Sequence, residues 1–310
     1  MIDFKYHVVS LISVFLAIAL GIIIGTTALN GGIVSNLQSN VKTLGNEKRE
    51  LENRVTELDQ AVSQNSEFDA AVAPQLVDGV LADENFIVIT VGDSVTAELR
   101  DPIIQMVQQS GAKNTGAISL TDTYSDPGHA DELLKFASND LPAGVTLPES
   151  NDAGEVVGGL LAAMLVAPAN GAGQPSAVIT TVLSGLGSLG VLKLDSTDVQ
   201  PAPNVVIVTS GSPGEDADER NDMILSLAVA LDKAGAAVVI AGDGSSADPD
   251  GLITAAREDA TVASSISTVD NAGYASGQVN VVWALRAEAD KKSGAYGSTA
   301  DAQPVAPVPS

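Results

Sequence analysis

The sequence predicts an α/β protein that begins with a transmembrane helix and a dimeric coiled coil. Three observations indicate this: an uncharged apolar run at residues 8–29, a heptad pattern directly after it, and short β-branched runs that alternate with helical segments beyond Pro74. The third pattern is typical of a mostly parallel, Rossmann-like sheet covered by helices on both faces. With 310 residues, of which 45% are hydrophobic, the chain is long enough to build one sizeable core.

The apolar run reads VVSLISVFLAIALGIIIGTTAL and has no charged side chain. A helix of this length spans about 33 Å, which matches the hydrocarbon thickness of a bilayer. The run is longer than the apolar part of a signal peptide and lacks a good cleavage motif, so it predicts an uncleaved anchor. Because Lys5 precedes it and no basic residue follows before Lys42, we expect residues 1–7 in the cytoplasm and the rest outside a cell membrane crossed once.

Residues 30–66 are expected to form a coiled-coil stalk. Apolar side chains recur there at alternating steps of three and four residues, with valine at the a positions, leucine at the d positions and one lysine at an a position. This combination favours a parallel homodimer, and the lysine can fix its register. The alternative is a single amphipathic helix packed on its own domain, which would show a wider apolar stripe. The predicted dimer seam is Val34, Leu37, Val41, Leu44, Lys48, Leu51, Val55, Leu58 and Val62.

Residues 67–290 are expected to form an extracytoplasmic α/β domain. Strand-like runs at 86–91, 116–120, 204–209 and 236–241 are each followed by turn residues, and Lys233 before Gly235 indicates the end of a helix. Asp152 and Glu155 have the spacing of a helix N-terminal capping box. Residues 291–310 contain small residues and prolines without an apolar period, so they predict a disordered tail.

Three glycine-containing turns follow predicted strands, at 92–94 (Gly-Asp-Ser), 210–212 (Ser-Gly-Ser) and 242–244 (Gly-Asp-Gly). In a parallel sheet such turns gather at the carboxyl edge, where ligands usually bind. No lysine or arginine lies beside them in the sequence. Ordinary turn chemistry explains these residues without a ligand, and a small-ligand or partner cleft is the alternative.

Composition excludes several kinds of chemistry. The chain has 39 acidic and 15 basic residues, a net charge of −24, and this charge repels nucleic acid and anionic lipid headgroups. There is no cysteine, and His7, His129 and four scattered methionines do not form the clustered soft ligands that Cu(I) prefers. Asp243, Asp248 and Asp250 lack the spacing of a calcium loop. We therefore expect no cofactor and no resident metal site.

Two motifs resemble enzyme signatures. Gly185, Gly187 and Gly190 have the spacing of a dinucleotide fingerprint, but the proline-rich turn that follows leaves too little room for the helix this motif requires. The Gly-Asp-Ser at 92–94 and the Asp-x-x-His at 126–129 resemble blocks of the GDSL hydrolases, in which a base activates the serine. Their order along the chain differs from that family, and Ser94 is equally suited to cap a helix. A hydrolase is therefore only a third candidate, and catalysis is not expected.

The opening FKYHVVSLISVFLAIALGIIIGT, the heptad segment and ISTVDNAGYASGQVNVVWAL at 266–285 resemble the actinobacterial family of mycobacterial copper transport protein B. The similarity extends from residue 1 to about residue 287. It implies copper transport or copper homeostasis, with a channel-like role in the mycobacterial outer envelope. Corynebacterial relatives are instead associated with cell separation, where they pair with a second membrane protein to control peptidoglycan hydrolases.

The residues themselves favour the second role. An anchor, a dimeric stalk and an exported domain suffice for a non-enzymatic scaffold or regulator that binds another envelope protein. Copper efflux is the alternative, which the resemblance alone implies. One membrane helix per chain cannot enclose a pore unless several chains assemble.

Overall fold

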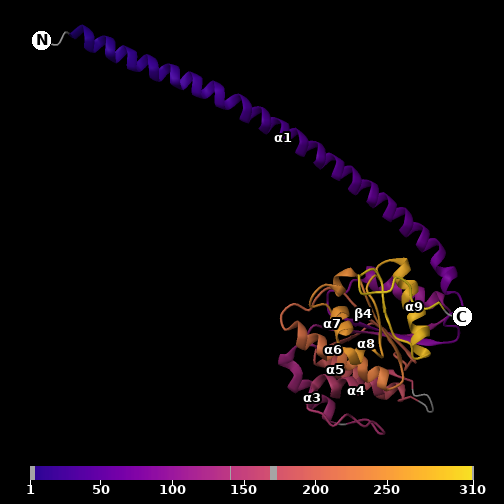
Figure 1. Ribbon diagram of the computed structural model, residues 1–310. Helices are drawn as coiled ribbons and strands as arrows, with labels where there is room; N and C mark the ends of the chain where they lie inside the picture. Colours follow the sequence, from indigo (N-terminus) through magenta and orange to yellow (C-terminus); the bar gives the residue numbers. More distant parts are fainter. Residues whose placement is uncertain (1–3, 140, 168–172, 309–310) are drawn as a thin grey trace. The chain divides into compact units, whose positions relative to one another are not determined.

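A computed structural model gives the fold of the chain (Figure 1). It describes residues 4–139, 141–167 and 173–308, and for residues 27–34 only the backbone. The chain divides into two units, Met1–Asn65 and Ser66–Ser310, and we call the second unit the head.

The head contains a seven-stranded sheet, eight further helices and two short 3-10 turns in its described part. The strands are β1 (Asn85–Val91), β2 (Lys113–Leu120), β3 (Leu192–Leu194), β4 (Asn204–Thr209), β5 (Ala237–Gly242), β6 (Ser267–Val269) and β7 (Ala295–Tyr296). The helices that follow α1 are α2 (Ala97–Gln109), α3 (Ala130–Ser138), α4 (Ala153–Leu165), α5 (Ser176–Ser188), α6 (Ala217–Lys233), α7 (Leu252–Glu258), α8 (Ala260–Ala263) and α9 (Ala275–Ala289); the 3-10 turns are η1 (Pro127–His129) and η2 (Gly244–Ala247).

Helix α1 (Phe4–Val77) includes both the predicted membrane span and the predicted stalk. Its segment Phe4–Thr26 is the one stretch of the described chain that is long and apolar enough to cross a membrane, and it is not buried against other residues. The helix continues past the expected domain boundary at residue 66 and includes Pro74. It ends before Gly79, whose positive φ of 74° suits a residue without a Cβ atom.

The sheet has the strand order β3-β2-β1-β4-β5-β6-β7. All neighbouring strands are parallel except β2 and β3, which pair antiparallel at one edge. The chain therefore builds outward from β1 in one direction and from β4 in the other. The α/β class and the mostly parallel sheet predicted from the sequence are confirmed, and the antiparallel edge is an addition that the sequence did not indicate.

Both faces of the sheet are covered, as the continuous apolar strands predict. In β1, Ile87 and Ile89 join a core under α3, α4, α5, α6 and α7, whereas Phe86 and Val88 join a second core under α2, α9 and the end of α1. Figure 1 shows α9 and the α3–α6 group on opposite sides of the strands. Successive side chains of a strand point to opposite faces of the sheet, so the side chains of β1 alternate between the two cores.

Helices α4 and α6 pack unusually closely. Asp152 caps α4 as the sequence predicts, because its carboxylate accepts a hydrogen bond of 2.9 Å from the backbone N–H of Glu155. Beyond this cap, a Cβ atom at Gly158 would lie 3.0 Å from the Cα of Leu227, and one at Gly154 would lie 3.1 Å from the Cα of Met223. These two glycines, four residues apart on one face of α4, let the two backbones approach.

The C-terminal segment differs from the predicted disordered tail. Arg257, on α7, is almost fully buried and forms an ion pair of 2.9 Å with Asp270, which has no exposed surface. The carboxylate of Asp270 also accepts hydrogen bonds from the backbone N–H of Ser298 (2.7 Å) and the hydroxyl of Thr299 (2.6 Å). Burial alone would raise the pKa of Asp270, but these hydrogen bonds and the arginine lower it.

This buried pair orders most of the segment after α9. Strand β7 pairs with β6, and Ala306 is buried, with its N–H donating to the side chain of Asn280. The prediction of disorder at 291–310 is therefore wrong for the described residues up to 308. It relied on composition, whereas the order comes from contacts with Asp270 and Asn280, which lie far earlier in the chain.

A second buried carboxylate lies close by. Glu288, on α9, is 2% exposed and accepts a hydrogen bond of 2.6 Å from the hydroxyl of Ser267. Burial, and then the charge of Asp232, raises its pKa from 4.5 to about 7. Since the hydrogen bond from Ser267 only partly compensates, Glu288 is protonated in the folded protein under mildly acidic conditions.

We predict that Gly158→Val will destabilise the head. The new side chain would collide with the backbone of Leu227, and forcing it into this contact should cost about 1–3 kcal/mol of unfolding free energy. Urea unfolding of the full-length protein in detergent, followed by the fluorescence of the single tryptophan, Trp283, measures the loss. Gly244→Ala is the control, because a Cβ atom there meets no neighbour within 4 Å. Equal stability of the two variants would contradict the close α4–α6 contact.

We also predict that Glu288 makes stability fall as pH rises. Its pKa is about 7 when folded and 4.5 unfolded, so the folded chain holds more protons between these values, and the free energy of unfolding decreases over that window. Glu288→Gln should remove this slope and be more stable than the wild type at pH 8 by about 2–3 kcal/mol, with little difference at pH 5. The same unfolding assay measures the effect, and Glu149→Gln, in an exposed loop, should retain the wild-type profile. A wild-type slope in Glu288→Gln would show that another group is responsible.

Candidate functional sites

The carboxyl edge of the sheet brings together the three turns that the sequence singled out. Strands β1, β4 and β5 are adjacent and parallel, so the turns at 92–94, 210–212 and 242–244 emerge on one edge. Because the chain order reverses between β1 and β4, this is the topological switch point of the sheet, where α/β proteins usually bind ligands. The predicted gathering of these residues is confirmed.

A small cleft of about 110 Å³ opens at the switch point. It is lined by two of the turns, together with Asp122, Ser125 and Arg220. Lys193, on β3, forms an ion pair of 2.9 Å with Asp93 in the first turn. Arg220, which lines the cleft, is a further cation that sequence reasoning missed, because it lies on α6, far along the chain from β1. Its guanidinium donates to the carbonyl oxygen of Asp122 at 2.8 Å and to that of Glu215 at 3.1 Å, so these backbone groups already use much of its capacity to bind an anion.

The third turn does not line the cleft but is hydrogen-bonded to the second turn, which does. Asp243 accepts hydrogen bonds from the hydroxyls of Ser210 (2.8 Å) and Ser245 (2.5 Å), and the hydroxyl of Ser245 accepts from the N–H of Gly211 (3.0 Å). Asp243 therefore acts here as a turn-stabilising acceptor. The polar groups of Ser210, Gly211, Asp243 and Ser245 satisfy one another, which agrees with the turn-chemistry interpretation, and the space left suits only a very small polar ligand.

The residues that resemble a hydrolase site are not arranged as one. The hydroxyl of Ser94 donates to the carbonyl oxygen of Ser210 at 2.8 Å, and the Nδ1 atom of His129 lies 3.4 Å from the carboxylate of Asp126. A nucleophilic serine requires a base within hydrogen-bond reach, and the structure gives Ser94 a carbonyl oxygen in place of an imidazole. Ser94 is also not the helix cap that the sequence allowed, because α2 begins after Thr96.

The other sequence motifs also receive a structural explanation. Gly185 and Gly187 lie in the last turns of α5, so they end a helix where a dinucleotide fingerprint would open one. Met106, Met164 and Met223 are buried in the two apolar cores. Among the described residues, no group of three or more His, Asp or Glu side chains could hold a metal ion.

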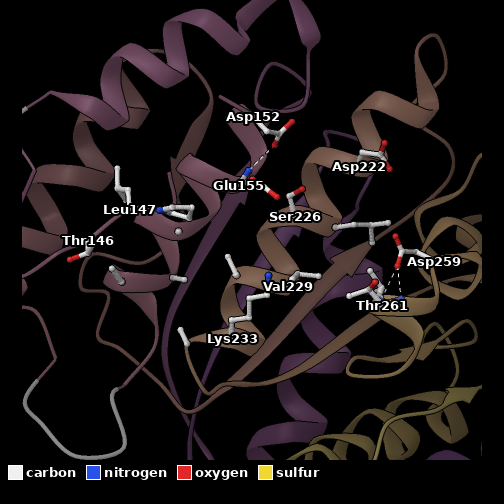
Figure 2. Close-up of a pocket in the computed structure, with 18 residues that line it drawn as sticks. Thr146, Leu147, Asp152, Glu155, Asp222, Ser226, Val229, Lys233, Asp259 and Thr261 are labelled. Atoms are coloured by element: carbon white, nitrogen blue, oxygen red, sulfur yellow. Dashed lines mark hydrogen bonds between the residues drawn. The ribbon is translucent and has the colours of Figure 1, made fainter. Parts of the chain in front are cut away.

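A larger concavity lies between α4 and α6, and we call it the α4–α6 groove (Figure 2). Its volume is about 1010 Å³. Apolar and small side chains form the floor, and four carboxylates together with Lys233 line the rim. The sequence did not predict this groove, although the spacing of Asp222, Ser226, Val229 and Lys233 along one helical face was a signal that could have indicated it.

The predicted dimer seam lies on α1, within the first unit. In the single chain, its apolar side chains from Leu37 to Val62 are each 55–65% exposed. Lys48 forms an ion pair of 3.3 Å with Glu52, one helical turn further on, and the side chain of Val34 lies outside the described residues. Such a row of exposed apolar side chains is characteristic of an interaction surface, but the coiled coil and the dimer remain predictions.

These features define a class of protein. A long helix with an apolar N-terminal segment is followed in the chain by an α/β head, whose sheet leaves little room for a ligand at its carboxyl edge.

The chain matches the family described as "Copper transport outer membrane protein, MctB" over residues 1–307, and it belongs to that family. It is 29% identical over 290 residues to a protein named copper transporter MctB from Mycobacterium tuberculosis (strain ATCC 25618 / H37Rv), with 92% of each chain covered. The protein of the same name from Mycobacterium leprae (strain TN) is 29% identical over 293 residues, again with 92% of each chain covered. The family resemblance inferred from the sequence is confirmed.

Proposed function

We propose that the protein takes part in copper transport or copper homeostasis of the cell envelope. The observation that supports this is the family match over nearly the entire chain. It favours copper handling over the scaffold role that the residues alone suggested. The apolar segment Phe4–Thr26 would anchor the chain in a membrane, with the head on the extracytoplasmic side.

The chemistry of the chain limits how it could move copper. Cu(I) prefers thiolate and thioether ligands, but the chain has no cysteine, and the methionines that the structure describes are packed in the cores. A single apolar helix also cannot enclose a pore. We therefore propose that the head does not itself bind copper, and that transport depends on assembly with other chains through α1.

Assembly would begin with the predicted parallel homodimer. Two copies of α1 could bury the exposed valines and leucines of the seam against each other, with Lys48 setting the register. In this proposal the protein acts without catalysis, by placing paired heads at a fixed distance from the membrane.

A second candidate is the scaffold or regulator of an envelope partner, including one that acts in cell separation. The exposed seam and the α4–α6 groove favour it, because both are suited to protein contacts and neither contains copper ligands. The two functions make different predictions for cells that lack the protein.

Deletion of the gene is expected to raise the copper content of cells grown with added copper, measured by elemental mass spectrometry, and the wild-type gene should restore the lower value. Zinc content, measured in the same samples, is the control and should not change. Normal copper together with chained or branched cells would contradict the copper proposal and favour the scaffold function.

The dimer has its own test. Leu44→Asp combined with Leu51→Asp places two charges in the seam of each chain, so chemical crosslinking of the membrane-bound protein should no longer yield dimers. Glu50→Gln with Glu57→Gln changes residues at positions that face away from the predicted seam and should leave the yield unchanged. If the double aspartate variant still crosslinks as the wild type does, the stalk does not hold the dimer together.

A further inference from the structure

We propose that the α4–α6 groove is a docking site for a cationic amphipathic helix of a partner protein. This inference concerns the head alone and does not depend on the copper proposal. It follows from the shape of the groove, the character of its floor and the charge of its rim.

Two helix faces form most of the lining of the groove, and Asp259, Thr261 and Val262 at the start of α8 complete it. Helix α6 presents Asp222, Ser226, Val229 and Lys233 at steps of four, three and four residues, so that they lie along one stripe. Helix α4 presents Gly159, Ala162 and Ala163, and the loop before it adds Leu147 and Pro148. A channel between two helices, with small residues at its base, has the form in which amphipathic helices bind.

The floor is apolar and only partly covered. Leu147, Ala163, Val229 and Ala230 are half-buried in the head, although they adjoin the large core. A ligand that bound through charge alone would leave these side chains in contact with water. The floor therefore favours an occupant that has an apolar face of its own.

The rim is strongly acidic. Asp152, Glu155, Asp222 and Asp259 all line the groove. Figure 2 labels all four: Asp152 and Glu155 lie close to Ser226, whereas Asp259 lies next to Thr261. Asp152 and Asp259 accept hydrogen bonds from backbone N–H groups at the start of α4 and α8. Glu155 and Asp222 have no ion-pair partner among the residues that the structure describes.

The described residues of the head form no ion pair with Glu155 or Asp222. Partial burial, and then repulsion from Asp218 and Asp259, raises the pKa of Asp222. A cationic side chain bound beside Asp222 would relieve that repulsion. The chain has few cations to spare for this role, since acidic residues outnumber basic ones by 39 to 15.

The charge of the rim and the apolar floor together specify which side chains a bound helix would carry. Its lysines or arginines would face the four carboxylates, and its apolar side chains would cover Val229 and Ala230. A polar or acidic residue would face Lys233, which gives the helix a preferred direction. Anionic lipid is disfavoured by the same carboxylates, and a metal ion would leave the apolar floor uncovered.

The absence of native cysteine allows a direct test. Ser226→Cys places one thiol in the middle of the groove, and Ser188→Cys places one on the exposed end of α5 as a matched control. The probe is a synthetic helical peptide of leucine, alanine and lysine that carries its lysines on one face and a single cysteine between its faces. Disulfide formation with the full-length protein in nonionic detergent, with dissolved oxygen as the oxidant that accepts the two electrons and two protons of the thiols, is followed on non-reducing gels. Trp283 emission verifies that each variant is folded.

We expect faster disulfide formation at position 226 than at position 188, and slower formation with a scrambled peptide of the same composition. Asp222→Asn with Asp259→Asn should raise the peptide concentration that gives the half-maximal rate about fivefold. The effect is small because each exposed charge pair contributes modestly to binding. Asparagine also caps helices, so α8 should keep its start. The matched double variant Asp131→Asn with Glu132→Gln removes the same charge from α3, outside the groove, and should have no effect.

Four results would overturn the proposal. Equal rates at positions 226 and 188 would show that the thiol reacts by random encounter. An unchanged rate in Asp222→Asn with Asp259→Asn, or an equal rate with the scrambled peptide, would show that the rim and floor do not select the ligand. Efficient disulfide formation between two Ser226→Cys chains without peptide would assign the groove to a second copy of the protein.

Discussion

The parallel pairing of β1 with β4 is the contact on which the rest of the head depends. Both strands are buried on both faces, and the chain extends from them in opposite directions, to β2 and β3 on one side and to β5, β6 and β7 on the other. Every helix must then cover one face or the other, since an exposed central strand would leave its apolar side chains in water. The same pairing fixes the position of the switch-point cleft.

The polar groups at the carboxyl edge of the sheet are hydrogen-bonded to one another, whereas some in the α4–α6 groove remain available to bind a partner. At the carboxyl edge, Asp243, Ser210 and Arg220 already have partners within the protein, and little space is left. The α4–α6 groove is different, because Glu155 and Asp222 line a wide channel and neither has an ion-pair partner in the described part of the chain. The groups available to bind a partner therefore lie in the α4–α6 groove and not at the switch point, where this fold usually binds ligands.

Family membership and residue chemistry bear on function in different ways. The relatives are named as copper transporters, whereas the described part of this head provides no cluster of soft donors and no clustered imidazoles or carboxylates suited to a metal. The two agree if copper handling belongs to an assembly in which this chain contributes the anchor, the stalk and the contact surfaces. On that view the exposed seam of α1 and the groove matter more than any single side chain as a metal ligand.

The sequence by itself determined the features that depend on neighbouring residues. The apolar segment of α1, the β-branched runs of β1, β4 and β5, the cap at Asp152 and the end of α6 are all local patterns, and the gathering of three turns followed from the parallel strands. Only the tertiary structure decided the antiparallel β3, the order of the C-terminal segment, and the placement of Arg220 and of the α4–α6 groove. Each of these depends on residues tens of positions or more apart, such as Asp270 with Thr299, and composition or periodicity within a short window carries no information about such contacts.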